Sequence, residues 1–98
     1  MKRKHKFVVT TKAIINILDA FEYYEFSQPG LGDSFLEYLE LSYRSIDNNP
    51  EIYKVIFKNF RQAKVNKFPY VIIYGIEQGE IIITKVFNTY QNPIKKIR

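Results

Sequence analysis

The stretch of residues 60–93 most constrains what this chain can fold into, because it is built from three consecutive segments of β-forming residues. The later two contain the runs YVIIY and IIIT, and β-branched and aromatic residues at this density favour strand over helix. Pro69 permits only a short corner, since it fixes φ and has no N–H to donate. Gln78-Gly79 predicts a tight turn, because glycine readily takes a positive φ. We expect antiparallel strands at residues 61–67, 70–76 and 80–88.

The central strands are apolar on both faces, whereas a sheet with one wet face alternates apolar and polar residues. Strand alternation places on one face Tyr70, Ile72, Tyr74 and Ile76, and on the other Val71, Ile73 and Gly75. On the last strand, the same alternation places Ile81 and Ile83 on one face and Ile82 and Val86 on the other. One of the two faces must pack into the core of the protein.

The second face is too apolar to be left bare, and an apolar patch of that size usually marks a binding surface. The sequence therefore predicts that a partner chain covers this face. The expected partner-binding residues are Val71, Ile73, Ile82, Lys85 and Asn88. The alternative is that a terminus of the chain folds over the face.

Two helical patterns precede the sheet. After an N-cap at Thr10-Thr11, apolar residues recur at helical spacing from residue 12 to about 26, with a stripe made of Ile14, Ile17, Leu18 and Phe21. The PGLG sequence at 29–32 breaks this helix, and a second one is expected from Asp33-Ser34 to about residue 46, before Pro50. Residues 4–10 alternate like a short strand, and residues 52–60 fit either an irregular lead-in or a strand extension. We predict an α+β fold with an N-terminal strand, an antiparallel helix hairpin and a three-stranded meander, the helices packing on one face of the sheet.

The charges are segregated along the chain of 98 residues, whose net charge is +5. Residues 1–12 carry five Lys or Arg and no acid, residues 13–53 eight acids and one base, and residues 54–98 nine bases and two acids. A basic sheet region favours an anionic partner, either nucleic acid or an acidic protein segment. Alternatively, its lysines and arginines keep the sheet soluble and its edges unpaired.

Composition excludes several classes of protein. The hydrophobic content of 46% is that of a folded chain, and the absence of cysteine excludes disulfides and thiolate chemistry. The basic start has no apolar segment of signal-peptide length behind it, and no run is long enough to cross a bilayer. We expect one domain, residues 1–98, located in the cytoplasm and without membrane contact.

The sequence offers few residues for catalysis. His5 is the only histidine and lies in a basic run, so we expect no metal site and no cofactor. The basic and phenolic side chains of the sheet region form the one plausible reactive set. Its members are Arg61, Lys64, Lys67, Lys85, Tyr70, Tyr74 and Tyr90. A metal-free ribonuclease could use a Lys or Arg of this set to stabilise charge on the scissile phosphate and a Tyr or Lys to move protons.

Several motifs taken together resemble the RelE/ParE toxin superfamily, and in particular its ParE-like, plasmid-stabilisation branch. They are Ala13 with Asn16-Ile17, PGLG followed by FLEYLE, Asn49-Pro50, Arg61, FPYVIIY and the closing VFNTYQNP. The resemblance covers residues 10–93. It implies a small α+β toxin of a type II toxin–antitoxin module, whose antitoxin folds around the toxin.

Two departures from the nuclease pattern bear on the target. RelE-like members cleave messenger RNA in the ribosome, whereas characterised ParE-type members poison DNA gyrase. Val71 stands where such nucleases have Arg, and NTYQ at 88–91 stands where many members read His-Thr followed by Arg. Loss of these bidentate donors weakens phosphate binding. The resemblance therefore favours a growth-inhibiting toxin that binds gyrase.

Two alternatives to the gyrase toxin stay open. One is a ribosome-dependent mRNA endonuclease that uses Arg61, Lys64 and Tyr90. The other is a non-toxic family member that acts only as a binding module. In each case the expected assembly is a homodimer or a hetero-oligomer of toxin with antitoxin.

Overall fold

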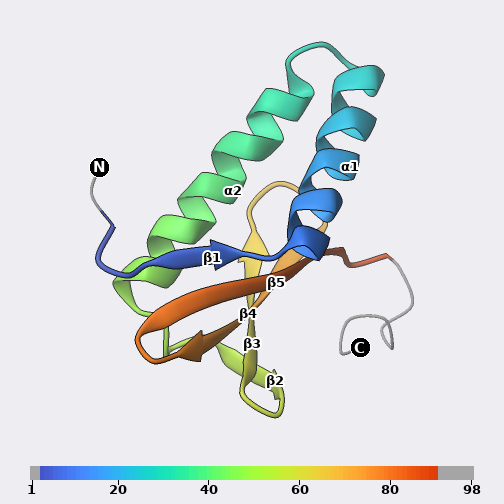
Figure 1. Cartoon of the computed structure of the whole chain (residues 1–98). Coiled ribbons are helices and arrows are strands. Elements are labelled where there is room, and N and C mark those ends of the chain that lie inside the picture. Colours follow the sequence, from blue (N-terminus) through green and yellow to red (C-terminus); the bar gives the residue numbers. More distant parts are fainter. Residues whose placement is uncertain (1–2, 91–98) are drawn as a thin grey trace.

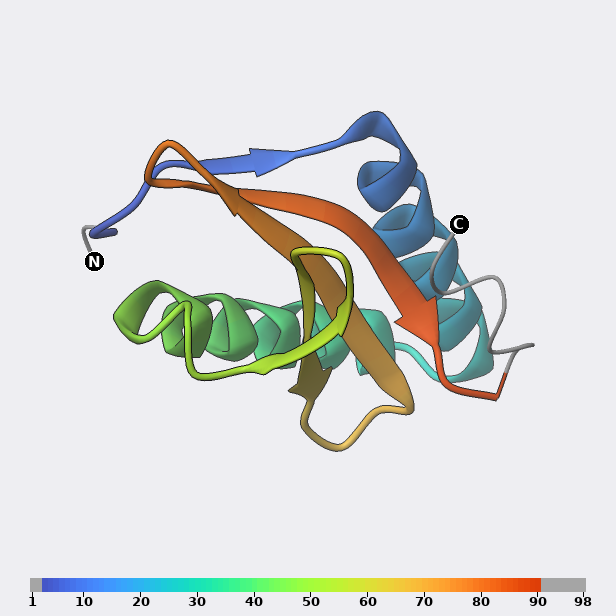
Figure 2. The ribbon, with the colours of Figure 1, turned by 90° about the horizontal axis from the view of Figure 1, so that it is seen from below.

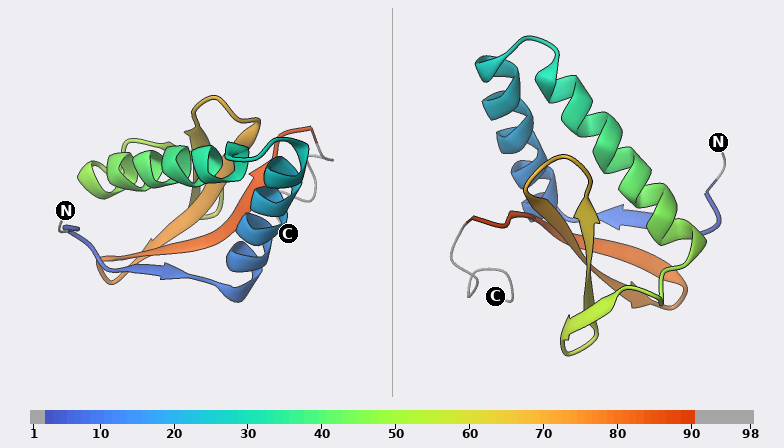
Figure 3. Two further views of the ribbon diagram at one scale, coloured as in Figure 1. Left: turned by 90° about the horizontal axis from the view of Figure 1, so that it is seen from above. Right: turned by 180° about the vertical axis from the view of Figure 1, so that it is seen from behind.

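The computed structural model describes residues 3–90 and has two layers, a helix pair lying over one face of a five-stranded sheet (Figures 1 and 3). The elements in chain order are β1 (Phe7–Val9), α1 (Thr11–Ser27), α2 (Leu31–Asn48), β2 (Lys54–Phe57), β3 (Phe60–Val65), β4 (Tyr70–Glu77) and β5 (Glu80–Asn88). The predicted α+β class and the placement of the helices on one face are confirmed.

The sheet has the strand order β1-β5-β4-β3-β2 (Figure 1). Strands β2 to β5 form an antiparallel meander, and β1 lies parallel to β5 at the edge, with Phe7 opposite Ile81. Residues 52–60, whose conformation the sequence left open, contribute β2, so the meander has four strands instead of three. The turn between β4 and β5 is as predicted, since Gln78 and Gly79 have φ values of 50° and 78°.

Helix α1 begins where the sequence predicts, because the Thr10 hydroxyl accepts a 3.2 Å hydrogen bond from the backbone N–H of Ala13. It packs against β5, while α2 packs against β3. Rings from both layers meet in the core, where the ring of Phe35 lies 5.1 Å from that of Tyr70 and 5.3 Å from that of Phe68. These aromatic contacts fix the helix pair on the sheet.

The two helices approach closely at Gly32. A Cβ atom built there would lie 2.8 Å from the ring and from the carbonyl oxygen of Phe21, so only glycine fits. The carboxylate of Glu25 accepts hydrogen bonds of 2.9 and 3.0 Å from the N–H groups of Gly30 and Gly32. These donors lie at the start of α2 and have no partner within the helix, so α1 itself caps α2. We predicted from the sequence that the second helix starts at Asp33-Ser34, whereas α2 starts at Leu31 and is capped by Glu25.

A β-bulge in β5 changes the predicted alternation. Ile73 pairs with Lys85 but Tyr74 pairs with Ile83, which leaves Thr84 as an extra residue. The extra residue turns Val86 to the helix side, where it is buried with Ile81 and Ile83. The prediction that Val86 shares a face with Ile82 was therefore wrong.

The second face of the sheet is covered by the chain's own hairpin. Val71, Ile73 and Phe87 form a buried cluster against which Ile56 of β2 and Phe60 of β3 pack. In Figure 2 the β2–β3 hairpin crosses in front of β4, and the ring of Phe60 lies 3.6 Å from where a Cβ of Gly75 would be. The expectation of an open apolar face was wrong, because a twisted sheet curls its edge hairpin over this side.

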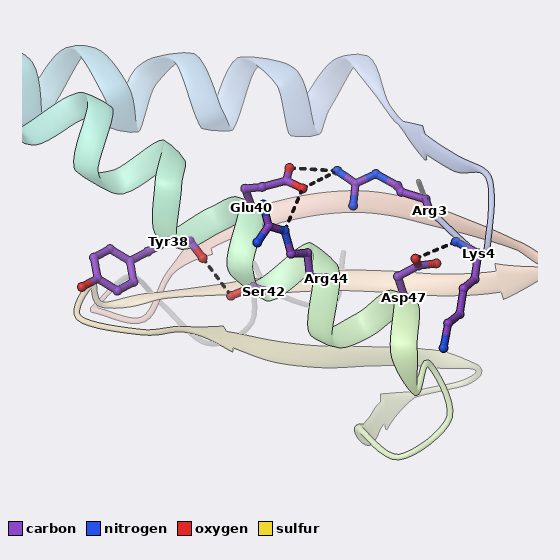
Figure 4. Close-up of polar contacts among 7 residues, drawn as sticks. All are labelled: Arg3, Lys4, Tyr38, Glu40, Ser42, Arg44 and Asp47. Atoms are coloured by element: carbon purple, nitrogen blue, oxygen red, sulfur yellow. Dashed lines mark hydrogen bonds and ion pairs between the residues drawn. The ribbon is translucent and has the colours of Figure 1, made fainter. Parts of the chain in front are cut away.

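The segment before β1 is hydrogen-bonded to the C-terminal half of α2 (Figure 4). The Arg3 guanidinium donates to both carboxylate oxygens of Glu40, at 2.8 and 2.9 Å. The backbone N–H of Lys4 donates to Asp47 at 2.7 Å. Near these contacts, the Ser42 hydroxyl donates to the carbonyls of Tyr38 and Lys64, which ties α2 to β3.

Candidate functional site

The predicted catalytic residues are not brought together. Arg61 lies opposite Tyr74 and Lys64 opposite Val71, and residues three apart on a regular strand point to opposite faces. Tyr90 follows β5, beyond Asn88, which pairs with Tyr70. Tyr70 and Tyr74 are four residues apart on β4, so Arg61 and Asn88 are separated by roughly 13 Å along the strand direction, and Tyr90 follows two residues after Asn88.

The Arg61 guanidinium is hydrogen-bonded to backbone carbonyl oxygens. Its Nη1 donates hydrogen bonds of 2.8 Å to the carbonyl oxygens of Glu51 and Tyr53, in the segment between α2 and β2. Tyr74 donates a 2.7 Å hydrogen bond to the carbonyl of Pro50 in the same segment. Lys64 is exposed, and Tyr90 is exposed to 86%. Their catalytic role stays a prediction.

The five residues expected to bind a partner are less accessible than the sequence indicated. Val71, Ile73 and Lys85 are buried, while Ile82 and Asn88 are half-buried. Burial, together with the nearby cation of Lys12, lowers the pKa of Lys85. Asn88 accepts a 2.9 Å hydrogen bond from the backbone N–H of Tyr90. Participation of these residues in binding stays a prediction.

Helix α1 has five exposed large apolar side chains, and we call this set the α1 outer surface. Its members are Ile14, Ile15, Leu18, Tyr23 and Phe26. Leu18 is exposed to 55% and Phe26 to 95%. These residues occupy the half of the helix circumference that faces away from the buried Ala13 and Ala20. Two acids on the same side, Asp19 and Glu22, make the surface both apolar and negative.

Part of the predicted apolar stripe of this helix lies on the α1 outer surface. Ile14 and Leu18 are exposed, and the buried residues Ala13 and Ala20, together with Asn16, lie on the side of α1 that faces the sheet. The Asn16 side-chain oxygen accepts a 3.1 Å hydrogen bond from the backbone N–H of Val86. Alanine lets α1 approach β5 closely, which turns the larger residues outward. The seven-residue spacing of Ala13 and Ala20 was the available signal.

Metal and membrane sites are not supported by the part of the chain that is described. Within residues 3–90, no three His, Cys, Asp or Glu side chains are grouped to hold a metal ion. Neither described helix has the length and apolarity needed to span a bilayer.

The helix hairpin over a curled meander is an architecture that is also found in a solved structure. The fold is similar to a solved structure described as the chromosomal ParDE TA system from P. aeruginosa, with a TM-score of 0.76 and 11% sequence identity. That match covers 86% of this chain and 95% of the other. A search of curated proteins finds no significant sequence match.

The sequence identifies the family directly. The family model described as "ParE toxin of type II toxin-antitoxin system, parDE" matches residues 7–93. The chain therefore belongs to the ParE toxin family and is the toxin component of a type II module. The predicted superfamily is confirmed.

Proposed function

We propose that this ParE family toxin arrests growth by binding DNA gyrase and is neutralised by a cognate antitoxin. The observation that carries this proposal is the α1 outer surface, where large apolar side chains such as Leu18 and Phe26 stand in solvent. A patch of this kind marks a protein-binding surface more often than an enzyme site. We place the antitoxin on this surface, instead of on the second face of the sheet, because Ile56 and Phe60 already cover that face.

Binding is favoured over RNA cleavage by the positions of the cations. A phosphate-cleaving site needs several charged donors converging on one point. Arg61 is engaged with the carbonyls of Glu51 and Tyr53, and Lys64 points to the opposite face of the sheet. The buried Val71 has no donor to offer. These features support a toxin that acts by occupying its target.

The test is induction of the chain in cells that lack the antitoxin. We expect growth arrest together with a DNA-damage response, and inhibition of supercoiling by purified gyrase when the purified chain is added. Lys64→Ala should remain as toxic as the wild type, as should the matched control Lys54→Ala, which removes another exposed lysine.

Two outcomes would contradict the proposal. Cuts in the ribosomal A site that appear on induction and vanish in Lys64→Ala, but persist in Lys54→Ala, would identify a nuclease. Unimpaired growth at high levels of folded chain would identify a non-toxic binding module.

A further inference from the structure

A pocket of about 400 Å³ lies between α1 and the adjoining ends of β4 and β5, and it shares Tyr23 and the neighbouring acid Asp19 with the α1 outer surface. It is lined from the helix by Asn16, Asp19, Ala20, Tyr23 and Tyr24, and from the sheet by Pro69, Tyr70, Val86, Asn88 and Tyr90. Pockets that hold small ligands or single side chains have this size and this mixture of aromatic and polar lining.

Four tyrosines surround the pocket. The ring centroids of Tyr23 and Tyr24 are 5.2 Å apart and those of Tyr24 and Tyr70 are 6.1 Å apart, with the rings steeply inclined in both pairs. Burial raises the pKa of Tyr24, and the nearby phenols of Tyr70, Tyr23 and Tyr90 raise it further. Tyr70 is buried, whereas Tyr23 and Tyr90 are exposed to 66% and 86%, so these two rings are accessible to an incoming group.

The electrostatic character of the pocket is negative. Asp19 supplies a carboxylate, and the described residues that line the pocket include no lysine, arginine or histidine. The faces of aromatic rings carry partial negative charge and attract cations. A phosphate group would find no positive partner here, whereas a cation would find ring faces and one carboxylate.

The amides in the pocket support its shape. Asn88 accepts from the backbone N–H of Tyr90 and thereby positions this tyrosine after the end of β5. Asn16 accepts from the backbone N–H of Val86 and holds α1 against the opposite wall. Both walls are therefore held in place by side-chain to backbone hydrogen bonds.

The geometry points to an aromatic cage that accepts an arginine side chain of a protein partner. A planar guanidinium stacks on a tyrosine ring while donating to a carboxylate, which a compact lysine ammonium does less well. Asp19 and Tyr23 lie on the same helix as Leu18 and Glu22, so a partner segment resting on the α1 outer surface would reach the pocket. The cage rests on the proposed function in one respect, that the partner is a protein.

The test uses the full-length chain, labelled with nitrogen-15, and a blocked arginine, Nα-acetyl-L-arginine amide. We expect saturable chemical-shift changes at the amides of residues 16–24, 70 and 86–90. Nα-acetyl-L-citrulline amide, which has nearly the same shape without the charge, should bind about tenfold more weakly. Equal binding of the two probes, or shifts confined to other residues, would overturn the cage.

Variants make the test specific. Asp19→Asn should weaken arginine binding by about tenfold, whereas Glu22→Gln, an equal loss of charge on the same helix outside the pocket, should leave it unchanged. Tyr23→Ala and Tyr90→Ala should each weaken binding without unfolding the chain, because both side chains are exposed. If Asp19→Asn binds arginine like the wild type, or adenosine monophosphate binds the pocket more tightly than arginine, the inference fails.

The outcome is separate from that of the proposed function. Saturable arginine binding by a chain that does not arrest growth would refute the toxin activity and leave the cage standing. Growth arrest with no arginine binding would refute only the cage.

Discussion

The carboxylate of Asp47 at the end of α2 accepts two hydrogen bonds from His5, one of 2.8 Å from its backbone N–H and one of 2.9 Å from its ring Nδ1. The N–H of Lys4 adds a third at 2.7 Å (Figure 4). Burial alone would raise the pKa of Asp47, but these hydrogen bonds and the charge of His5 outweigh it, so the pKa is lowered. The Asp47 side chain thus holds Lys4 and His5 against α2.

The first prediction concerns acid stability. Because the pKa of Asp47 is lower in the folded chain than its ordinary value of 3.8, ionised Asp47 stabilises the fold above about pH 4. That contribution is lost as the pH falls through the folded pKa. Asp47→Asn should lower the free energy of unfolding at pH 7, and the difference from the wild type should shrink as the pH approaches 2. Urea unfolding at several pH values measures this.

Asp33→Asn, at an exposed position of the same helix, is the control. A constant difference between Asp47→Asn and the wild type across this range would contradict the prediction.

The second prediction contrasts two buried phenols. Tyr74 donates to the Pro50 carbonyl, whereas within residues 3–90 the buried hydroxyl of Tyr43 has no hydrogen-bond partner. Tyr74→Phe should cost about 1 kcal/mol of unfolding free energy, and Tyr43→Phe should cost nothing or stabilise the fold. Chemical denaturation of the two variants compares them directly. Equal losses in both variants would contradict the prediction, because the hydrogen bond from Tyr74 to Pro50 would then not set the difference between them.

The third prediction concerns alkaline pH. Burial raises the pKa of Tyr43 and of Tyr74 to about 12 from the ordinary value of 10.0. A raised pKa gives stability that is fully present below pH 10 and is lost as the pH rises toward 12. Phenolate absorbance should therefore show late-ionising tyrosines, one fewer in each Tyr→Phe variant. Titration of both variants with the same midpoints as the wild type would contradict this.

The fourth prediction concerns the contact between the helices. Gly32→Ala places a methyl group 2.8 Å from Phe21, including its backbone oxygen, so α1 and α2 must move apart. We expect a loss of about 1–3 kcal/mol, as for other overpacked sites. Ser45→Ala, at an exposed position of α2, should change stability little. Thermal unfolding of the two variants measures both effects, and a harmless Gly32→Ala would show that the helices are not in close contact.

The fifth prediction addresses the α1 outer surface. Leu18→Glu should weaken binding of a cognate antitoxin at least tenfold, because it places a charge in an apolar contact. Ile52→Glu, a matched change at a residue that is 72% exposed and remote from α1, should bind normally. Titration calorimetry with each folded variant checks this. Weaker binding by Ile52→Glu alone would indicate that the antitoxin binds the region before β2 and not the α1 outer surface.

Local patterns predicted most of the elements. The runs YVIIY and IIIT, the Thr10 cap and the Gln78-Gly79 turn each depend on neighbouring residues, and the structure has them where expected. The features that were missed depend on contacts between distant residues. The bulge at Thr84 reverses the direction of Val86, and Phe60 packs over Gly75 only once β3 and β4 are paired.

The same distinction applies to the candidate site. Residue type selected Arg61, Lys64 and Tyr90 as a reactive set, but the register of β3 with β4 separates them. Helical periodicity alone did not show which side of α1 faces the sheet, because large apolar residues occupy both sides. The close approach of Ala13 and Ala20 to the sheet decides the orientation, and it becomes visible only in three dimensions.

The pairing of β1 with β5 joins the first strand of the chain to the last. Phe7 and Ile81 are neighbours in space, although 74 residues separate them in the sequence. During synthesis, β1 leaves the ribosome long before β5, and β4, which can already pair with β3, lacks its second partner until β5 has emerged. A nascent chain therefore cannot complete its five-stranded sheet until β5 has been synthesised.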